Sequence, residues 1–204
     1  SIGIEDFRNV DDLELHNCTV REGHMFASHL GGSIWPVRME NCAFDNVNFT
    51  QIAGDTGDTD PTMAHYDYNA FATGQPRLPL AGAHDVIVTN FNWQTSWLGN
   101  FYLPPSSALI NAGSITADQV GLYHFTTQTS QLKETNSIVD IGYHYVATDA
   151  YGYPIDTDGD GIPDYLEDSN GNGIFDAGDL GDWLISRFNG LSRTNGLQVF
   201  TPLK

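Results

Sequence analysis

LELHNCTV at residues 13–20 and VRMENCAF at residues 37–44 share one pattern of side chains. In both stretches apolar residues alternate with others up to an Asn, and an apolar residue follows it; the Asn residues are 24 positions apart. Alternation predicts a β-strand with one buried face. Asn tolerates the left-handed backbone that turns a chain sharply. Each stretch therefore predicts a strand–turn–strand unit.

A third copy of the pattern is VIVTNFNW at residues 86–93. Units of this size cannot hold a core alone, so their repetition predicts a solenoid in which successive coils stack. Stacking would pair equivalent positions of the first two copies, namely Leu15 with Met39, Asn17 with Asn41 and Cys18 with Cys42. The alternative is a β-sandwich whose strands share a pattern.

The repeated form resembles the rungs of right-handed parallel β-helix proteins, the pectate-lyase-like superfamily. Three further segments are similar to an inter-rung segment, a segment near the C-terminal end and a closing strand of bacterial β-helices: YDYNAF at 66–71, SALINAG at 107–113 and VDIGYHY at 139–145. The chain departs from these motifs at Asn111, where Asp is usual, and at His144, where Glu is usual. The resemblance covers about residues 1–147.

This resemblance implies a short solenoid or the C-terminal end of a longer one, because only about four to six coils fit. Inserts such as residues 54–61 would form loops on one side. Members of the superfamily often cleave acidic polysaccharides, and the outward-facing candidates for such chemistry are Arg21, Arg38, Glu14 and Glu40. Charged residues on a solvated strand face are usually only that, so we assign no catalytic residue.

The sharpest chemical signal is DTDGDGIPDYLE at residues 156–167. An EF-hand-type calcium loop needs oxygen ligands at positions 1, 3, 5, 9 and 12, a Gly at position 6 and a backbone carbonyl at position 7. The segment fills every ligand position, with Asp156, Asp158, Asp160, the carbonyl of Ile162, Asp164 and Glu167. Gly161 occupies position 6.

The next twelve residues, DSNGNGIFDAGD at 168–179, repeat the design. The corresponding ligands are Asp168, Asn170, Asn172, the carbonyl of Ile174, Asp176 and Asp179, with Gly173 at position 6. This loop has three carboxylates where the first has five, so we expect weaker binding there. The two loops together predict two or more bound Ca²⁺ ions.

The loops abut, whereas EF-hands and dockerins separate their loops by helices. This spacing resembles thrombospondin type 3 repeats, in which successive aspartate-rich loops wrap a row of calcium ions. A dockerin-like alternative stays open, because apolar residues with helical spacing follow the second loop: Leu180, Trp183, Leu184 and Phe188.

Charge supports a cation-binding protein. The 204 residues carry 26 acids against 8 bases, a formal net charge of −18. Such a field repels nucleic acid and anionic membranes, and no stretch is apolar enough to predict a transmembrane segment. Nine of the acids lie between residues 156 and 182, where no Lys or Arg occurs. With only two cysteines, Cys18 and Cys42, the redox compartment and their bonding stay undecided.

These observations predict an all-β chain: a right-handed parallel β-helix with its cap over residues 1–150, a calcium-loop module with a short helix over 151–190, and a tail over 191–204. We expect a secreted or cell-surface protein, because extracellular modules bind calcium at the concentrations found outside cells. The favoured function is a calcium-stabilised structural or adhesive scaffold, capable of self-association. The alternatives are the C-terminal fragment of a polysaccharide lyase, hydrolase or carbohydrate-binding protein, and a dockerin-like docking module.

Overall fold

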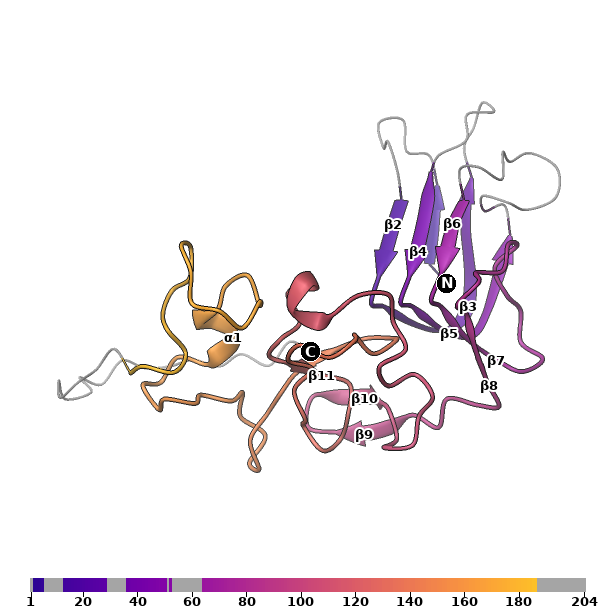
Figure 1. Cartoon of the computed structure of the whole chain (residues 1–204). Helices are drawn as coiled ribbons and strands as arrows, with labels where there is room; N and C mark the ends of the chain where they lie inside the picture. Colours follow the sequence, from indigo (N-terminus) through magenta and orange to yellow (C-terminus); the bar gives the residue numbers. More distant parts are fainter. Residues whose placement is uncertain (1, 6–12, 29–35, 51, 53–63, 187–204) are drawn as a thin grey trace.

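The computed structural model describes residues 2–5, 13–28, 36–50, 52 and 64–186, and over this part the protein is all-β (Figure 1). The helices in the described part, the 3-10 helix η2 (Ala117–Val120) and the α-helix α1 (Asp164–Glu167), have four residues each, so neither could cross a lipid bilayer. The strands of the two parallel sheets are β1 (Ile2–Glu5), β2 (Leu13–His16), β3 (Thr19–Ser28), β4 (Val37–Glu40), β5 (Ala43–Thr50), β6 (Ala64–Asp67), β7 (Ala70–Ala72) and β8 (Val86–Val88).

Three strand–turn–strand units build these sheets. The units β2–β3, β4–β5 and β6–β7 each place one strand in a three-stranded sheet of order β2-β4-β6 and one in a five-stranded sheet of order β1-β3-β5-β7-β8. All neighbours in both sheets are parallel. Figure 1 shows the units side by side at one end of the molecule, with the chain bending between the two sheets.

The predicted stacking of the first two units is confirmed. Leu15 pairs with Met39 in one sheet, and Thr19 pairs with Ala43 in the other. Between these pairs, Asn17 and Asn41 both adopt the left-handed conformation, with φ of 52° and 56°. The Asn residues therefore turn the chain from one sheet into the other, as their side-chain chemistry predicts.

The predicted third copy at residues 86–93 is wrong. β8 pairs with β7, the second strand of the preceding unit, and so extends the five-stranded sheet. The first strand of a unit such as residues 13–20 lies in the three-stranded sheet instead. The true third unit is residues 64–71, in which Tyr66 stacks on Met39 and Tyr68 takes the left-handed turn with a φ of 54°. The pattern misled because Asn90 resembles a turn residue, whereas the left-handed residue of that segment is Asn92.

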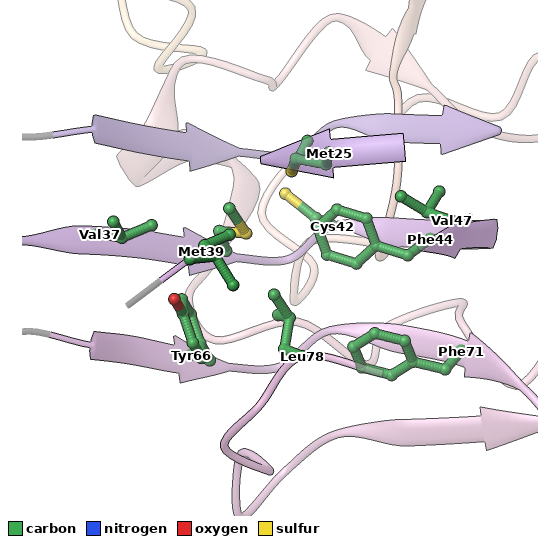
Figure 2. Packing of buried hydrophobic residues seen from close by; sticks show 10 residues of the cluster. Met25, Val37, Met39, Cys42, Phe44, Val47, Tyr66, Phe71 and Leu78 are labelled. Atoms are coloured by element: carbon green, nitrogen blue, oxygen red, sulfur yellow. The ribbon is translucent and has the colours of Figure 1, made fainter. Parts of the chain in front are cut away.

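Apolar side chains fill the space between the two sheets (Figure 2). Met39, Cys42 and Phe71 have no exposed surface, and Phe44 is only 1% exposed. The Phe44 ring stacks on Phe71 with centroids 5.6 Å apart and meets Phe49 edge-on at 5.2 Å. One aromatic ladder therefore ties neighbouring units together, in addition to the strand hydrogen bonds.

The segment after β8 is built mainly from turns, with two small antiparallel pairs. These pairs are β9 (Gln94–Ser96) with β10 (Gly99–Tyr102), and β11 (Phe125–Thr126) with β12 (Tyr145–Val146). The segment returns to the stack, where the backbone N–H of Gly142 donates to the Asn41 carbonyl at 2.9 Å. The closing strand predicted at 139–145 is largely wrong, because only its last residue belongs to a strand. Residues 139–144 instead bury side chains such as Asp140 and His144.

The short helix predicted after the second loop is also wrong over residues 180–186, which form turns. The backbone N–H groups of Leu180 and Gly181 donate to the Glu167 carbonyl, and the Asp182 side chain accepts from the Leu184 N–H. These bonds hold the chain in a non-helical path. The one α-helix of the described part, α1, lies within the first loop. Phe188, the tail over 191–204 and the predicted insert at 54–61 lie outside the described residues.

Candidate metal centre

Three carboxylates of the first loop converge. Asp156, Asp158 and Asp160 each offer an oxygen, and these oxygens all lie within 4.8 Å of one another. Asp160 is buried, and the other two are half-buried. Positions 1, 3 and 5 of the predicted loop are thus gathered around one point.

Backbone N–H groups hold these carboxylates in place. The Gly161 N–H donates to Asp156 at 2.9 Å, the Asp160 N–H to Asp158 at 3.0 Å, and the Ile162 N–H to Asp160 at 2.9 Å. Each acid therefore binds a donor further along its own loop and fixes the curl of the backbone. One oxygen of Asp158, Oδ2, is buried without a hydrogen-bond partner.

The second loop repeats these contacts twelve residues later. The Gly173 N–H donates to Asp168 at 2.6 Å, the Asn172 N–H to the Asn170 side-chain oxygen at 3.0 Å, and the Ile174 N–H to the Asn172 oxygen at 2.7 Å. Positions 6 to 1, 5 to 3 and 7 to 5 are thus bonded in the same way in both loops. This correspondence is stronger evidence that the two loops are structural repeats than the sequence pattern alone, because it concerns backbone geometry.

Glycine is required at position 6 of both loops. Gly161 and Gly173 have φ of 97° and 77°, a conformation that other residues rarely adopt. A Cβ added to Gly173 would also lie 2.3 Å from the ring of Tyr123. The second loop therefore packs its tightest turn directly against the body of the protein.

Position 9 of the first loop has partners within the protein. Asp164, 1% exposed, accepts hydrogen bonds from Lys133 Nζ at 2.6 Å and from the Thr157 N–H at 2.6 Å. The Thr157 hydroxyl donates to the same carboxylate at 2.7 Å. This acid ties the loop to residue 133 and is not in the group of three converging carboxylates.

Position 12 of the first loop and position 1 of the second are adjacent and buried. Glu167 has no exposed surface, and Asp168 is 1% exposed. Asp168 lies 2.9 Å from His124 Nε2. Burial and the charge of Lys133 lower the pKa of His124, so the imidazole is neutral at pH 7 and donates its Nε2–H to Asp168.

The Trp183 indole lies over the contacts of His124 with Asp168 and of Lys133 with Asp164. Its ring lies 5.1 Å from the His124 ring, and Lys133 Nζ lies 5.3 Å from its centroid. Trp183, expected on a helix, therefore packs against the two side chains that join the loops to the body of the protein.

The last ligand positions of the second loop are more exposed. Asp176 accepts from the side-chain amides of Asn170 and Asn172, at 3.2 and 3.0 Å. Asp179 accepts from the Ser169 and Asp176 N–H groups at 2.9 and 2.8 Å.

At position 7 the two loops differ. The side chain of Ile174 is 65% exposed, whereas Ile162 is half-buried. Only in the first loop is the apolar side chain at position 7 partly buried.

Electrostatics in the first loop disfavours a third negative charge. Burial, together with the charges of Asp160 and Asp156, raises the pKa of the Asp158 carboxyl. A proton or a cation relieves this repulsion. At neutral pH the donor set, three carboxylates with hard oxygen atoms, suits a divalent cation such as Ca²⁺.

Lys133 and His124 were missed by sequence reasoning. They lie 31 and 44 residues before the acids that they contact, and no spacing rule connects them to a calcium loop. The only available signal was that Lys133 is the last base before the acidic stretch.

The outward-facing residues considered for catalysis form ion pairs with other surface residues. Arg21 Nε lies 3.3 Å from Asp45. Arg38 Nε lies 3.4 Å from Glu14, and His16 lies 3.4 Å from Glu14 and 3.7 Å from Glu40. The side chains on β2 and β4 are largely exposed, so they form a surface network of ion pairs.

Comparison of the chain with protein-family models, curated proteins and solved structures gave no match.

Proposed function

We propose that residues 156–179 bind calcium as a tandem pair of loops and that the ions stabilise an extracellular or cell-surface scaffold. The observation that carries this proposal is the repeated set of backbone contacts, in which positions 1, 3 and 5 of both loops accept the same N–H groups. A solvated acidic linker would have no reason to repeat such geometry every twelve residues. Asp156, Asp158 and Asp160 would supply the first ligands.

The converging acids also need a counter-charge. Among the described residues of the loop segment no Lys or Arg occurs, and the base that reaches it, Lys133, is bound to Asp164. A divalent ion would offset two of the three negative charges of the clustered carboxylates without burying a further side chain. The abutting loops support a row of ions, in the manner of thrombospondin type 3 repeats.

For residues 1–150 we propose the terminal coils and cap of a right-handed parallel β-helix. Three units stacked in parallel register, with left-handed turn residues between the sheets, support this architecture. Stacked coils and ion-stabilised loops suit a structural role. The ion pair between Arg38 and Glu14 is a surface contact and gives no support to a catalytic role. A secreted structural or adhesive role follows, with calcium taken from the exterior.

Calcium titration of the full chain after chelator treatment tests the metal proposal. Isothermal titration calorimetry should detect two or more sites with dissociation constants of about 10⁻⁴ to 10⁻³ M, the range of extracellular modules. The double variant Asp158→Asn, Asp160→Asn should weaken the first-loop site at least about tenfold, since it removes two of three converging charges. Glu14→Gln is the matched control, because it removes one exposed acid distant from the loops and should change nothing.

Two results would overturn the proposal. One is the absence of any calcium-dependent heat or melting shift at ion concentrations up to about 10⁻² M, well above the expected range. The other is an equal response of the double variant and the wild type. Magnesium serves as the competing ion, because it demands a smaller, more rigid octahedral site and should bind less well.

A second candidate function is protein docking by the loop module. Exposed apolar side chains gather in this short part of the sequence: Ile174, Phe175, Leu180, Leu184 and Ile185 are 55–65% exposed. Leu184→Asp should then abolish capture of a partner without changing the melting temperature. Trp183 is unsuitable for this test, because it packs against His124 and Lys133 and its loss would loosen the module itself.

A further inference from the structure

Cys18 and Cys42 occupy equivalent corners of two stacked units. Each follows a left-handed Asn, and the flanking pairs His16 with Glu40 and Thr19 with Ala43 are in register. Parallel neighbours are about 4.8 Å apart, which falls within the Cα separation that a disulfide spans. Both cysteines are free thiols.

The two side chains meet in the interior. The Cys42 thiol reaches across to the neighbouring unit, where it lies 3.3 Å from the Leu15 carbonyl oxygen, and it is also hydrogen-bonded to the Cys18 sulfur. Figure 2 shows the Cys42 sulfur directed away from its own strand, toward the adjacent unit. The Cys18 thiol donates to the His16 carbonyl at 3.1 Å.

The two thiols differ in exposure and acidity. Cys42 has no exposed surface, whereas Cys18 is half-buried and within reach of solvent. The hydrogen bond from Cys42 lowers the pKa of Cys18 to about 7, and burial raises the pKa of Cys42. The Cys18 thiol is thus within reach of solvent and about half ionised at pH 7, whereas the Cys42 thiol is protected and protonated.

A metal does not explain the pair. Among the described residues, the acids of the first calcium loop are the group of potential ligands that converge, and neither cysteine belongs to such a group. Burial as an apolar residue explains Cys42, and Cys18 also packs partly against the core, but burial alone would raise the pKa of Cys18 and does not account for its acidity.

We propose that Cys18 and Cys42 form a thiol–disulfide exchange site, in which Cys18 attacks and Cys42 resolves, and which closes as a disulfide between stacked units. The oxidant is a small disulfide R–S–S–R. The Cys18 thiolate attacks one sulfur, forming Cys18–S–S–R and releasing RS⁻. Cys42 then loses its proton and attacks the Cys18 sulfur, releasing the second RS⁻; both leaving groups end as RSH. Two thiols are oxidised and one disulfide is reduced to two thiols.

Oxidised glutathione and the native full chain test this exchange site. Wild-type protein should lose about 2 Da, the mass of two hydrogen atoms, and both its titratable thiols. Arg21 and Arg38 lie between the cysteines, so trypsin should yield the peptides 9–21 and 39–77 joined under non-reducing conditions. The same result is expected with or without a calcium chelator, because the site does not depend on the proposed calcium function.

Single variants separate the two roles. Cys42→Ala should stop at a stable glutathione adduct on Cys18, and Cys18→Ser should stay unmodified at Cys42. The pH at which Cys18 alkylation is half-maximal should rise from about 7 toward the ordinary value of about 8.5 in Cys42→Ala, since the hydrogen bond is lost. The proposal is overturned if native wild-type protein ends as glutathione adducts or stays reduced, and the wild-type mapping decides this even if a variant fails to fold.

Discussion

The stacked units and the proposed calcium loops are both repeats, but they are held together by opposite means. In the units, Met39, Phe44 and Phe71 are buried against one another, and the backbone hydrogen bonds run from strand to strand. In the loops, carboxylates accept the backbone N–H groups, and apolar side chains such as Ile174 lie exposed. The units gain stability from every neighbour added. The loops gather negative charge with every repeat, and in the proposed function an outside cation offsets this charge.

The body of the protein contributes one positive charge, Lys133, and one neutral hydrogen-bond donor, His124, to this acidic segment. Lys133 pairs with Asp164 and His124 with Asp168, and Trp183 covers both. These contacts dock the loops while leaving Asp156, Asp158 and Asp160 for an ion. Ion removal should therefore loosen the loops without unfolding the units, and core mutations should do the reverse.

The largest expected effect is a core truncation in the units. Phe44→Ala removes a buried ring that contacts two others, so the free energy of unfolding should fall by about 3–5 kcal/mol. Urea denaturation followed by circular dichroism measures this change. Phe175→Ala is the matched control in the loop module: its ring is 56% exposed, and its loss should cost less than about 0.5 kcal/mol. Equal effects would erase the distinction between the two regions.

Calcium removal is the corresponding test of the loops. At an ion concentration a hundred times the dissociation constant, one bound ion stabilises the folded loop by about 2.7 kcal/mol. Chelation should therefore speed amide hydrogen exchange throughout residues 156–179 and leave β4 and β5 unchanged. Hydrogen-exchange mass spectrometry resolves the two regions in one experiment. Uniformly faster exchange over both would mean that the ions stabilise the whole chain and not the loops.

The sequence was sufficient where the physical rule is local. Alternation and the left-handed preference of Asn predicted the register of Leu15 with Met39, and ligand spacing predicted the curl around Asp156 and Asp160. Both signals lie within one unit and need no knowledge of distant residues. The assignment of an all-β chain also followed from them.

The sequence was insufficient where distant segments decide the outcome. The third unit uses Tyr68 at its turn, which no left-handed preference would select, because stacking on the previous unit imposes that conformation. Residues 180–186 have helical spacing, but the N–H groups of Leu180 and Gly181 bind the Glu167 carbonyl instead. Lys133 and His124 reach the loops from over thirty residues away.

Asp140 is a buried acid in the segment between the stacked units and the loops, and its charge depends on pH. Burial and the charge of Glu134 raise the pKa of Asp140 to about 6, against an ordinary value of about 3.9. Because the folded state holds this proton more tightly, the contribution to stability is complete below pH 4 and is lost as pH rises through 6. The loss should reach about 2 kcal/mol.

Urea titrations at pH 4 to 7 in chelator measure that loss. The Asp140→Asn variant should show a flatter pH profile than the wild type, since the amide cannot ionise. Glu14→Gln removes an exposed carboxyl and should keep the wild-type slope. Identical slopes for wild type and Asp140→Asn would mean that Asp140 is ionised in the folded protein throughout this range.

The smallest expected effect compares two equivalent positions within the units. Asn17 and Asn41 share nearly the same φ, but only Asn41 binds the following segment: its side chain donates to Ser114 Oγ at 3.1 Å and accepts from the Ser114 N–H at 2.9 Å. Asn41→Gly should therefore lower the free energy of unfolding by about 1–2 kcal/mol. Asn17→Gly keeps the left-handed turn and removes a side-chain oxygen that has no hydrogen-bond partner, so it should stay within about 0.5 kcal/mol of wild type. Chemical denaturation of the two variants measures the difference, and equal losses at both positions would mean that the turn conformation itself, and not the bond to Ser114, sets the requirement for Asn.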